Sequence, residues 1–228
     1  MAIKLYEKAI SLDDCQAPYV KAFIYDCLNG AYLQIDNVEK ALEYGKKSVE
    51  TKMIEPFAIN YIKVLLTQHR FSEADSVFQR LFAQRKTTTE ALNLLTRMYL
   101  LARQPVNALK PALAAFKSAP FDAETITYLG YANMINNYYN RAERYFTRAL
   151  QANTQHDFFV RLCLIQNCMK QDNQEKTDFF AQQLLDTYPI QQIFDGLEQK
   201  RTKQDSPIRL SYDKIKESIA DQIDKYGE

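Results

Sequence analysis

Residues 141–150 read Arg-Ala-Glu-Arg-Tyr-Phe-Thr-Arg-Ala-Leu, and this stretch decides the fold. The small residue Ala142 is followed four residues later by the aromatic Phe146 and three residues after that by the small residue Ala149. Steps of four and three residues place these side chains on one face of an α-helix. Small side chains let a second helix approach closely, and an aromatic ring fills the space between the helices. The stretch therefore predicts a helix that packs tightly on a neighbour.

Related stretches recur along the chain. The small or short residue that begins each of them, here called the anchor, is Ala2, Ala41, Ala74, Ala108, Ala142 and Thr177. Successive anchors are separated by 39, 33, 34, 34 and 35 residues. A fixed period of this length is typical of stacked supersecondary units.

A second helical pattern precedes every anchor except the first. It places large, apolar, small or polar, and large residues at steps of three and four, most clearly in residues 25–32, 92–99 and 126–133. Residues 61–65 and 164–168 fill the same places less well. Each unit therefore supplies two amphipathic helices, and because one pair cannot bury its own apolar face, the units are expected to stack.

Turn-forming residues fall between the two helices of a unit. The pairs that can cap the second helix are Asp36-Asn37, Asn136-Asn137 and Asp172-Asn173. Pro105 lies at the same place and suits the first turn of a helix. Pro120 and Pro189 each follow an anchor by twelve residues, where the second helix is expected to end.

The sequence from residue 1 to about residue 189 resembles the tetratricopeptide repeat family, whose unit is about 34 residues long. The best match is residues 126–150, which keep the residues Leu129, Gly130, Ala142, Phe146 and Ala149. The positions that depart from the family pattern are Gly45, Asn133, Cys168 and Thr177.

The resemblance implies an all-α fold, an α-solenoid of about five to six tetratricopeptide-type helix pairs that form a right-handed superhelix, with C-terminal capping helices. The repeat array is expected over residues 1–189 and the capping helices over residues 190–228. A non-repeating helical bundle and a different α-solenoid with less regular pairs are the alternatives. On the repeat interpretation Gly130 lies where two helices of one unit cross, so Gly130→Leu is expected to cost about 1–3 kcal/mol.

The two ends of the chain differ from the repeats. Residues 1–14 match the second helix of a unit whose first helix is missing, so the chain is either a shortened array or begins with its own capping helix. Residues 190–203 predict one further helix. Residues 212–226 carry three isoleucines on one narrow stripe and charges elsewhere, which fits a capping helix, with a coiled-coil partner helix as the alternative.

The composition argues against several functional classes. The net charge is +1, which gives no electrostatic reason to expect nucleic acid, and no apolar run approaches the roughly 18 residues of a membrane helix. Phosphate-binding and serine-hydrolase motifs are absent, and His69 and His156 do not have metal-ligand spacing. The sequence therefore predicts no enzyme, no cofactor, no metal site, no nucleic-acid partner and no membrane insertion.

The four cysteines, Cys15, Cys27, Cys163 and Cys168, form no CxxC pair. Their spacing suits neither a disulfide framework nor a metal knuckle, so they are expected to be small apolar core residues. This pattern favours a reducing compartment and hence the cytoplasm. A periplasmic location stays open if a signal segment precedes the sequence.

The resemblance also implies a groove that is lined by the first helix of each unit and binds a segment of a protein or peptide partner. The expected groove residues are Lys63, Leu66, Asn93, Arg97, Leu100, Tyr131, Met134, Gln166 and Met169. Four of them continue an apolar row that begins at Leu33, and an open apolar row with polar neighbours is typical of a binding surface. The alternative is that this row packs between neighbouring helices or is covered by the C-terminal helix.

On the open-groove hypothesis the ligand has apolar anchors and some acidic character, because Lys63 and Arg97 lie beside the row. Arg97→Glu together with Met134→Glu is then expected to abolish partner binding and to leave the fold intact. Some members of the family hold the C-terminal carboxylate of chaperones with lysine, asparagine and arginine side chains. Asn60 fits that set, but Asp26 and Glu90 would repel a carboxylate, so no such activity is expected.

The function expected from these patterns is a protein–protein interaction scaffold. Two alternatives are a regulatory or sensor arm of a larger catalytic or DNA-binding protein, and an assembly factor for an envelope or secretion machine. Neither the partner nor the oligomeric state follows from the sequence.

Overall fold

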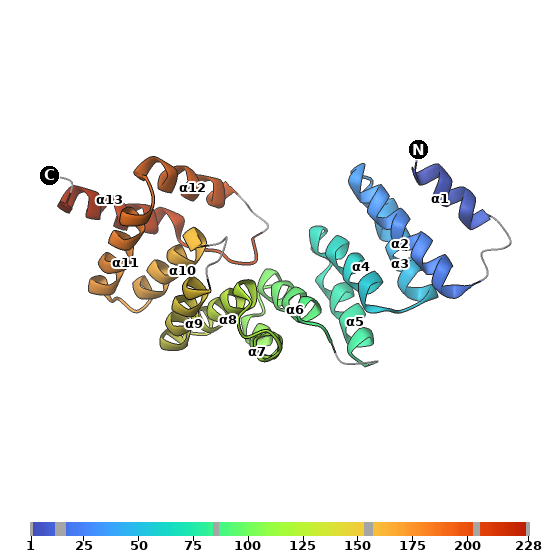
Figure 1. Ribbon diagram of the computed structural model, residues 1–228, viewed down its shortest axis with the longest axis horizontal. Helices are drawn as coiled ribbons and strands as arrows, with labels where there is room; N and C mark the ends of the chain where they lie inside the picture. The colour runs from blue at the N-terminus through green and yellow to red at the C-terminus, as the bar shows by residue number, and fades with distance from the viewer. Residues whose placement is uncertain (1, 12–16, 84–86, 153–156, 203–205, 227–228) are drawn as a thin grey trace. The chain divides into compact units, whose positions relative to one another are not determined.

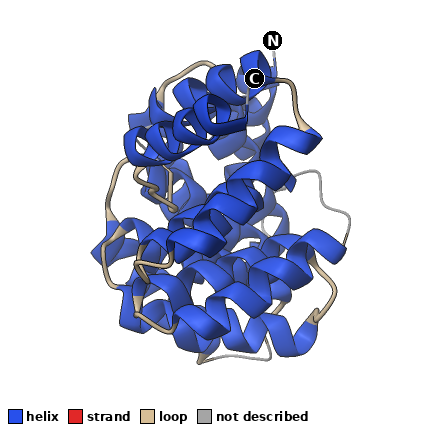
Figure 2. Ribbon diagram, turned by 90° about the vertical axis from the view of Figure 1, so that its left-hand side faces the viewer, coloured by secondary structure: helices blue, strands red, loops and turns tan. Residues whose placement is uncertain are grey.

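The computed structural model describes residues 2–11, 17–83, 87–152, 157–202 and 206–226. These residues form thirteen α-helices and no strand (Figure 2). The predicted all-α class is therefore confirmed. The helices belong to two compact units, residues 1–98 and 99–228, and the division falls within α6.

The first unit holds six helices, the last of which continues past residue 98 (Figure 1). They are α1 (Ala2–Ser11), α2 (Pro18–Gln34), α3 (Val38–Thr51), α4 (Glu55–Thr67), α5 (Phe71–Phe82) and α6 (Thr89–Leu101). Helix α2 packs on α1, α3 and α4, and α4 packs on α3 and α5. The helix predicted near the N-terminus is α1.

The second unit holds seven helices. They are α7 (Pro105–Ser118), α8 (Ala123–Ile135), α9 (Tyr139–Gln151), α10 (Asp157–Met169), α11 (Gln174–Thr187), α12 (Ile190–Thr202) and α13 (Tyr212–Tyr226). Helix α8 packs on α7 and α9, α10 packs on α9 and α11, and α13 packs on α10, α11 and α12. Both helices predicted after residue 189 are confirmed, and α7 and α11 end shortly before Pro120 and Pro189 as expected.

The anchors explain how each helix pair packs. The five anchors from Ala41 to Thr177 are buried, whereas Ala2 is exposed on α1. A Cβ atom added at Gly130 would lie 2.7 Å from the ring of Phe146, so α8 and α9 cross with no room for a side chain. At Gly45, which replaces the aromatic residue of the pattern, a Cβ would lie 2.6 Å from the Tyr61 ring. A ring from the next helix pair thus fills the space there.

The first helix of each pair ends in the same way. The backbone φ is positive at five non-glycine residues, which recur at the repeat period: Asp36, His69, Arg103, Asn137 and Asp172. In each turn the N–H of the next residue donates to a carbonyl five residues earlier, as Gln104 does to Tyr99 at 2.8 Å. This pairing of a left-handed residue with a long backward hydrogen bond is the Schellman ending of an α-helix.

The predicted caps are confirmed in two turns and wrong in one. Asn37 and Asn173 each accept a backbone hydrogen bond, from Lys40 and Lys176, at the start of α3 and α11. The pair Asn136-Asn137 does not cap α9, because the Asn136 amide donates to Pro105 and Ala132 carbonyls and Asn137 occupies the left-handed position. Pro105 begins α7 as predicted.

Arg103→Gly is expected to stabilise the protein by up to about 1 kcal/mol. The left-handed region costs a residue with a Cβ atom about 1–2 kcal/mol of conformational free energy. The greater freedom of glycine in the unfolded state offsets about 0.5–1 kcal/mol of the stabilisation. The measurement is urea denaturation of the purified chain. Arg103→Ala is the control, because it removes the side chain and keeps the strain; equal stabilisation by both variants would contradict this explanation.

Candidate functional site

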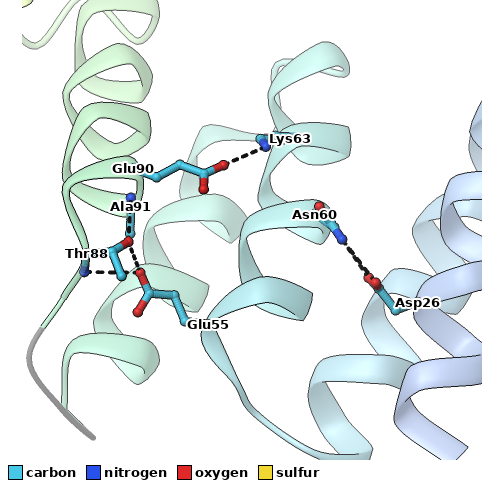
Figure 3. Close-up of polar contacts among 7 residues, drawn as sticks. All are labelled: Asp26, Glu55, Asn60, Lys63, Thr88, Glu90 and Ala91. Atoms are coloured by element: carbon cyan, nitrogen blue, oxygen red, sulfur yellow. Dashed lines mark hydrogen bonds and ion pairs between the residues drawn. The ribbon is translucent and has the colours of Figure 1, made fainter. Parts of the chain in front are cut away.

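Three first helices of the first unit present one polar face, here called the α2–α4–α6 face (Figure 3). The Asn60 amide of α4 donates to both carboxylate oxygens of Asp26 on α2, at 3.2 and 3.0 Å. The Lys63 ammonium of α4 lies 2.9 Å from the Glu90 carboxylate of α6. Each helix of this face is therefore joined to the next by a side-chain pair.

Glu55 positions the start of α6 on the same face (Figure 3). Its carboxylate accepts hydrogen bonds from the backbone N–H of Thr88, at 3.1 Å, and from the Thr88 hydroxyl. The Thr88 hydroxyl oxygen in turn accepts from the backbone N–H of Ala91 at 3.3 Å. A carboxylate near the first N–H groups of a helix is stabilising, because those groups have no partner within the helix.

Burial raises the pKa of the Asp26 carboxyl above its ordinary value, and the hydrogen bond from Asn60 partly offsets this rise. The Lys63–Glu90 pair is about half exposed, with 49% and 63% of the two side chains accessible, so it adds little stability. Lys63 offsets the charge of Glu90, whereas the neutral amide of Asn60 leaves the charge of Asp26 in place. These four positions consequently keep a formal net charge of −1, from one lysine against two carboxylates.

The α2 part of this face exposes apolar side chains. Tyr19, Phe23 and Leu33 are 55%, 49% and 39% exposed, and they share one side of α2 with Asp26 and Gly30 by their spacing of four, three, four and three. Gly30 is open, because a Cβ added there would meet nothing within 4 Å. Large exposed apolar groups beside polar ones are typical of a partner-binding surface.

In the structure the predicted groove residues range from exposed to buried. Lys63 and Arg97 are exposed, and Met169 is half-buried. The others are buried: Leu66, Asn93, Leu100, Tyr131, Met134 and Gln166. The two exposed basic residues belong to the first unit, where Lys63 is already paired with Glu90.

The expected open apolar row is wrong at Leu66, Leu100 and Met134. These side chains are 5%, 2% and 1% exposed, and the last two belong to the buried core of the second unit. A row on the first helices faces the neighbouring helix as well as the solvent, and here the neighbour covers it. Of the five positions in the row, Leu33 is exposed and Met169 is half-buried.

Tyr131 and Gln166 are buried under a segment of the same chain, residues 208–211, which precedes α13. The Tyr131 hydroxyl donates to the carbonyl of Arg209 at 3.1 Å and accepts from the N–H of Arg209 at 2.9 Å. The Gln166 side-chain oxygen accepts from the N–H of Ser211 at 2.5 Å. Burial raises the pKa of Tyr131, and the backbone N–H of Arg209 opposes the rise. The repeat pattern assigns no role to this segment, and the alternation of Ile208 and Leu210 is the one local signal for it.

The cysteines that the structure describes fit the predicted core role in two cases. Cys163 and Cys168 are buried, and Cys27 is half-buried. Burial raises the pKa of both buried thiols, that of Cys168 to about 11, with Glu143 contributing to the latter. Thiols with such pKa values stay protonated and unreactive at neutral pH. Cys15 and His156 lie outside the described residues.

Within the described ranges, no three histidine, cysteine or acidic side chains come together as a metal site would require. Nor is any described helix sufficiently long and apolar to span a lipid bilayer.

No family model and no curated protein matches the sequence. Solved structures do match the fold. YrrB, described as a TPR protein with an unusual peptide-binding site, has a TM-score of 0.68 and 16% identity over 87% of this chain and 99% of its own. MamA from Desulfovibrio magneticus RS-1 has a TM-score of 0.66 and 18% identity over 73% of this chain and 94% of its own. PilW, a type IV pilus biogenesis factor, has a TM-score of 0.66 and 16% identity over 84% and 87%.

Proposed function

Since the chain has the tetratricopeptide-repeat fold, we propose that it is a protein-interaction scaffold whose α2–α4–α6 face binds a segment of a partner protein. The observation that carries this proposal is the exposed apolar side of α2, which Tyr19 and Phe23 share with the open position Gly30. Fold alone does not fix function, so the proposal depends on this surface.

The partner segment is expected to offer apolar anchors with few charges. Aromatic side chains supply much of the energy of protein interfaces, and Tyr19 and Phe23 are both about half exposed. Asp26 and Glu90 already hold polar partners from neighbouring helices. Asp26 and Glu90 would repel an acidic ligand, whereas an apolar ligand only covers the rings.

Photo-crosslinking tests where a partner binds. A photoreactive phenylalanine analogue replaces Phe23 in the full chain, and a second version carries it at Val106, which is 70% exposed on α7. We expect the same partner to be crosslinked repeatedly from position 23 and not from position 106. Equal crosslinking from both positions, or none from position 23, would refute the proposed surface.

Gly30→Trp is expected to weaken binding of that partner by about tenfold or more, which corresponds to about 1.4 kcal/mol. The added ring has space on the face, so it fills the proposed site without displacing core residues. Affinity is measured with the crosslinked partner segment as a labelled peptide.

Gly30→Ala is the matched control for this substitution. It is expected to retain binding and to stabilise the chain by about 0.5–1 kcal/mol, because alanine favours a helix interior more than glycine does. Loss of binding in both variants would mean that helix stability, not occupation of the surface, controls affinity.

A further inference from the structure

In the second unit Tyr131 and Gln166 hold an extended segment of the chain, apart from the face that the proposed function uses. Residues 208–211 follow Ser206 and Pro207 and run without helical structure to the start of α13. Ile208 and Leu210 are 3% and 9% exposed, whereas the residues between and after them are exposed. Alternation of this kind is typical of an extended strand whose every second side chain is buried.

The contacts that hold this segment are made to its backbone. Tyr131 on α8 binds both the N–H and the carbonyl of Arg209, and Gln166 on α10 binds the N–H of Ser211. Hydrogen bonds to backbone atoms do not depend on the side chain, while pockets for alternate side chains give selectivity. Protein surfaces recognise extended peptides by this combination of backbone hydrogen bonds and side-chain pockets.

The two polar side chains that hold the segment, Tyr131 and Gln166, are here called the Tyr131–Gln166 seat. Their burial indicates that they bind a ligand. Tyr131 and Gln166 are each only 4% exposed, and Tyr131 lies in the apolar core cluster. A hydroxyl and an amide in such surroundings need hydrogen-bond partners. Residues 208–211 provide those partners, whereas the first helices of a repeat array can be packed by apolar side chains alone.

The helix that follows the docked segment, α13, buries polar atoms that have no hydrogen-bond partner within the described part of the chain. Among the described residues, buried side-chain atoms without a hydrogen-bond partner include Tyr212 Oη, Ser218 Oγ and Gln222 Oε1, all on α13. Water would satisfy these atoms if the segment and α13 left the seat. The segment also lines a hollow of about 810 Å³, together with residues 200, 201 and 212–214.

We propose that residues 208–211 are an intramolecular ligand, and that the Tyr131–Gln166 seat binds an extended segment of a partner protein with an aliphatic residue, any residue, and a second aliphatic residue. The partner displaces residues 208–211 and takes over their backbone hydrogen bonds. An internal ligand lowers the apparent affinity of a competing one by the fraction of molecules whose seat is open.

The test uses a labelled peptide with the sequence of residues 206–212 and the full chain. Wild-type chain is expected to bind it weakly, and the double variant Ile208→Ser, Leu210→Ser is expected to bind it about tenfold more tightly or better, because its own segment no longer fills the pockets. Ser211→Ala is the matched control; it keeps the backbone N–H and should bind as wild type does.

Two further changes test whether the gain in peptide affinity arises at the Tyr131–Gln166 seat. Adding Tyr131→Phe to the double variant should reverse most of the gain, because the phenyl ring fills the same space without the hydroxyl. A peptide with both aliphatic residues replaced by serine should not bind. Amide hydrogen exchange of α8 and α10 shows whether each variant is folded; if the double variant is not, Leu210→Ser alone replaces it and is expected to show a smaller gain.

No gain in a folded variant would overturn the proposal, as would a gain that survives Tyr131→Phe. Light scattering tests whether the remaining possible occupant, a second copy of this chain, binds at the seat. If wild-type chains form dimers that the serine substitutions dissociate, the seat binds residues 208–211 of a second copy, and the proposal of a different partner protein is wrong.

Discussion

Phe146→Ala is expected to lower the free energy of unfolding by about 3–5 kcal/mol, because a fully buried aromatic ring leaves a cavity that its surroundings fill only in part. The ring lies against Gly130 on α8, so its removal takes packing contacts from both helices of the pair. The measurement is urea denaturation, with amide exchange of α8 and α9 to locate the effect. Thr147→Ala, at an exposed position of the same helix, should change stability by less than about 0.5 kcal/mol.

The pair Phe146 and Gly130 also makes a double-mutant cycle. Gly130→Leu alone should cost about 1–3 kcal/mol, because its side chain has no room beside the ring. In the Phe146→Ala background the leucine can occupy the vacated space, so the double variant should be more stable than the sum predicts by at least about 1 kcal/mol. Additive costs would mean that the two side chains do not share one space.

Met134→Glu is expected to cost at least about 3 kcal/mol, since it places an unpaired carboxylate in the core of the second unit. Met134→Leu keeps the volume and should cost less than about 1.5 kcal/mol. Thermal and urea unfolding of both variants measure the difference. A glutamate variant as stable as the leucine variant would show that position 134 reaches solvent.

Because Met134 is buried, the double variant Arg97→Glu, Met134→Glu does not test a binding surface alone. The open-groove hypothesis predicts that the double variant stays folded and loses the partner. Arg97 is exposed, and Arg97→Glu should alter stability by no more than about 0.5 kcal/mol. Loss of binding in the Met134 variant would instead follow from loss of structure, so only Arg97→Glu tests a surface.

The candidate sites could be predicted only in part. Lys63 and Arg97 were identified as exposed groove residues and are exposed. The pairing of Lys63 with Glu90, 27 residues away, could not be foreseen, because it depends on how α4 and α6 are placed. The exposed rings of Tyr19 and Phe23 were not singled out, since the repeat pattern assigns no role to those positions.

The sequence by itself determined the helix pairs, their turns and their close crossings. Ala142, Phe146 and the period of about 34 residues are local signals, and helix formation and packing between neighbours depend on local spacing. Only the tertiary structure decided which side chains of a first helix are open. Met134 is buried and Leu33 exposed at equivalent positions, because their neighbours differ. It also decided that Arg209 docks on Tyr131, 78 residues away, a contact that no periodic pattern encodes.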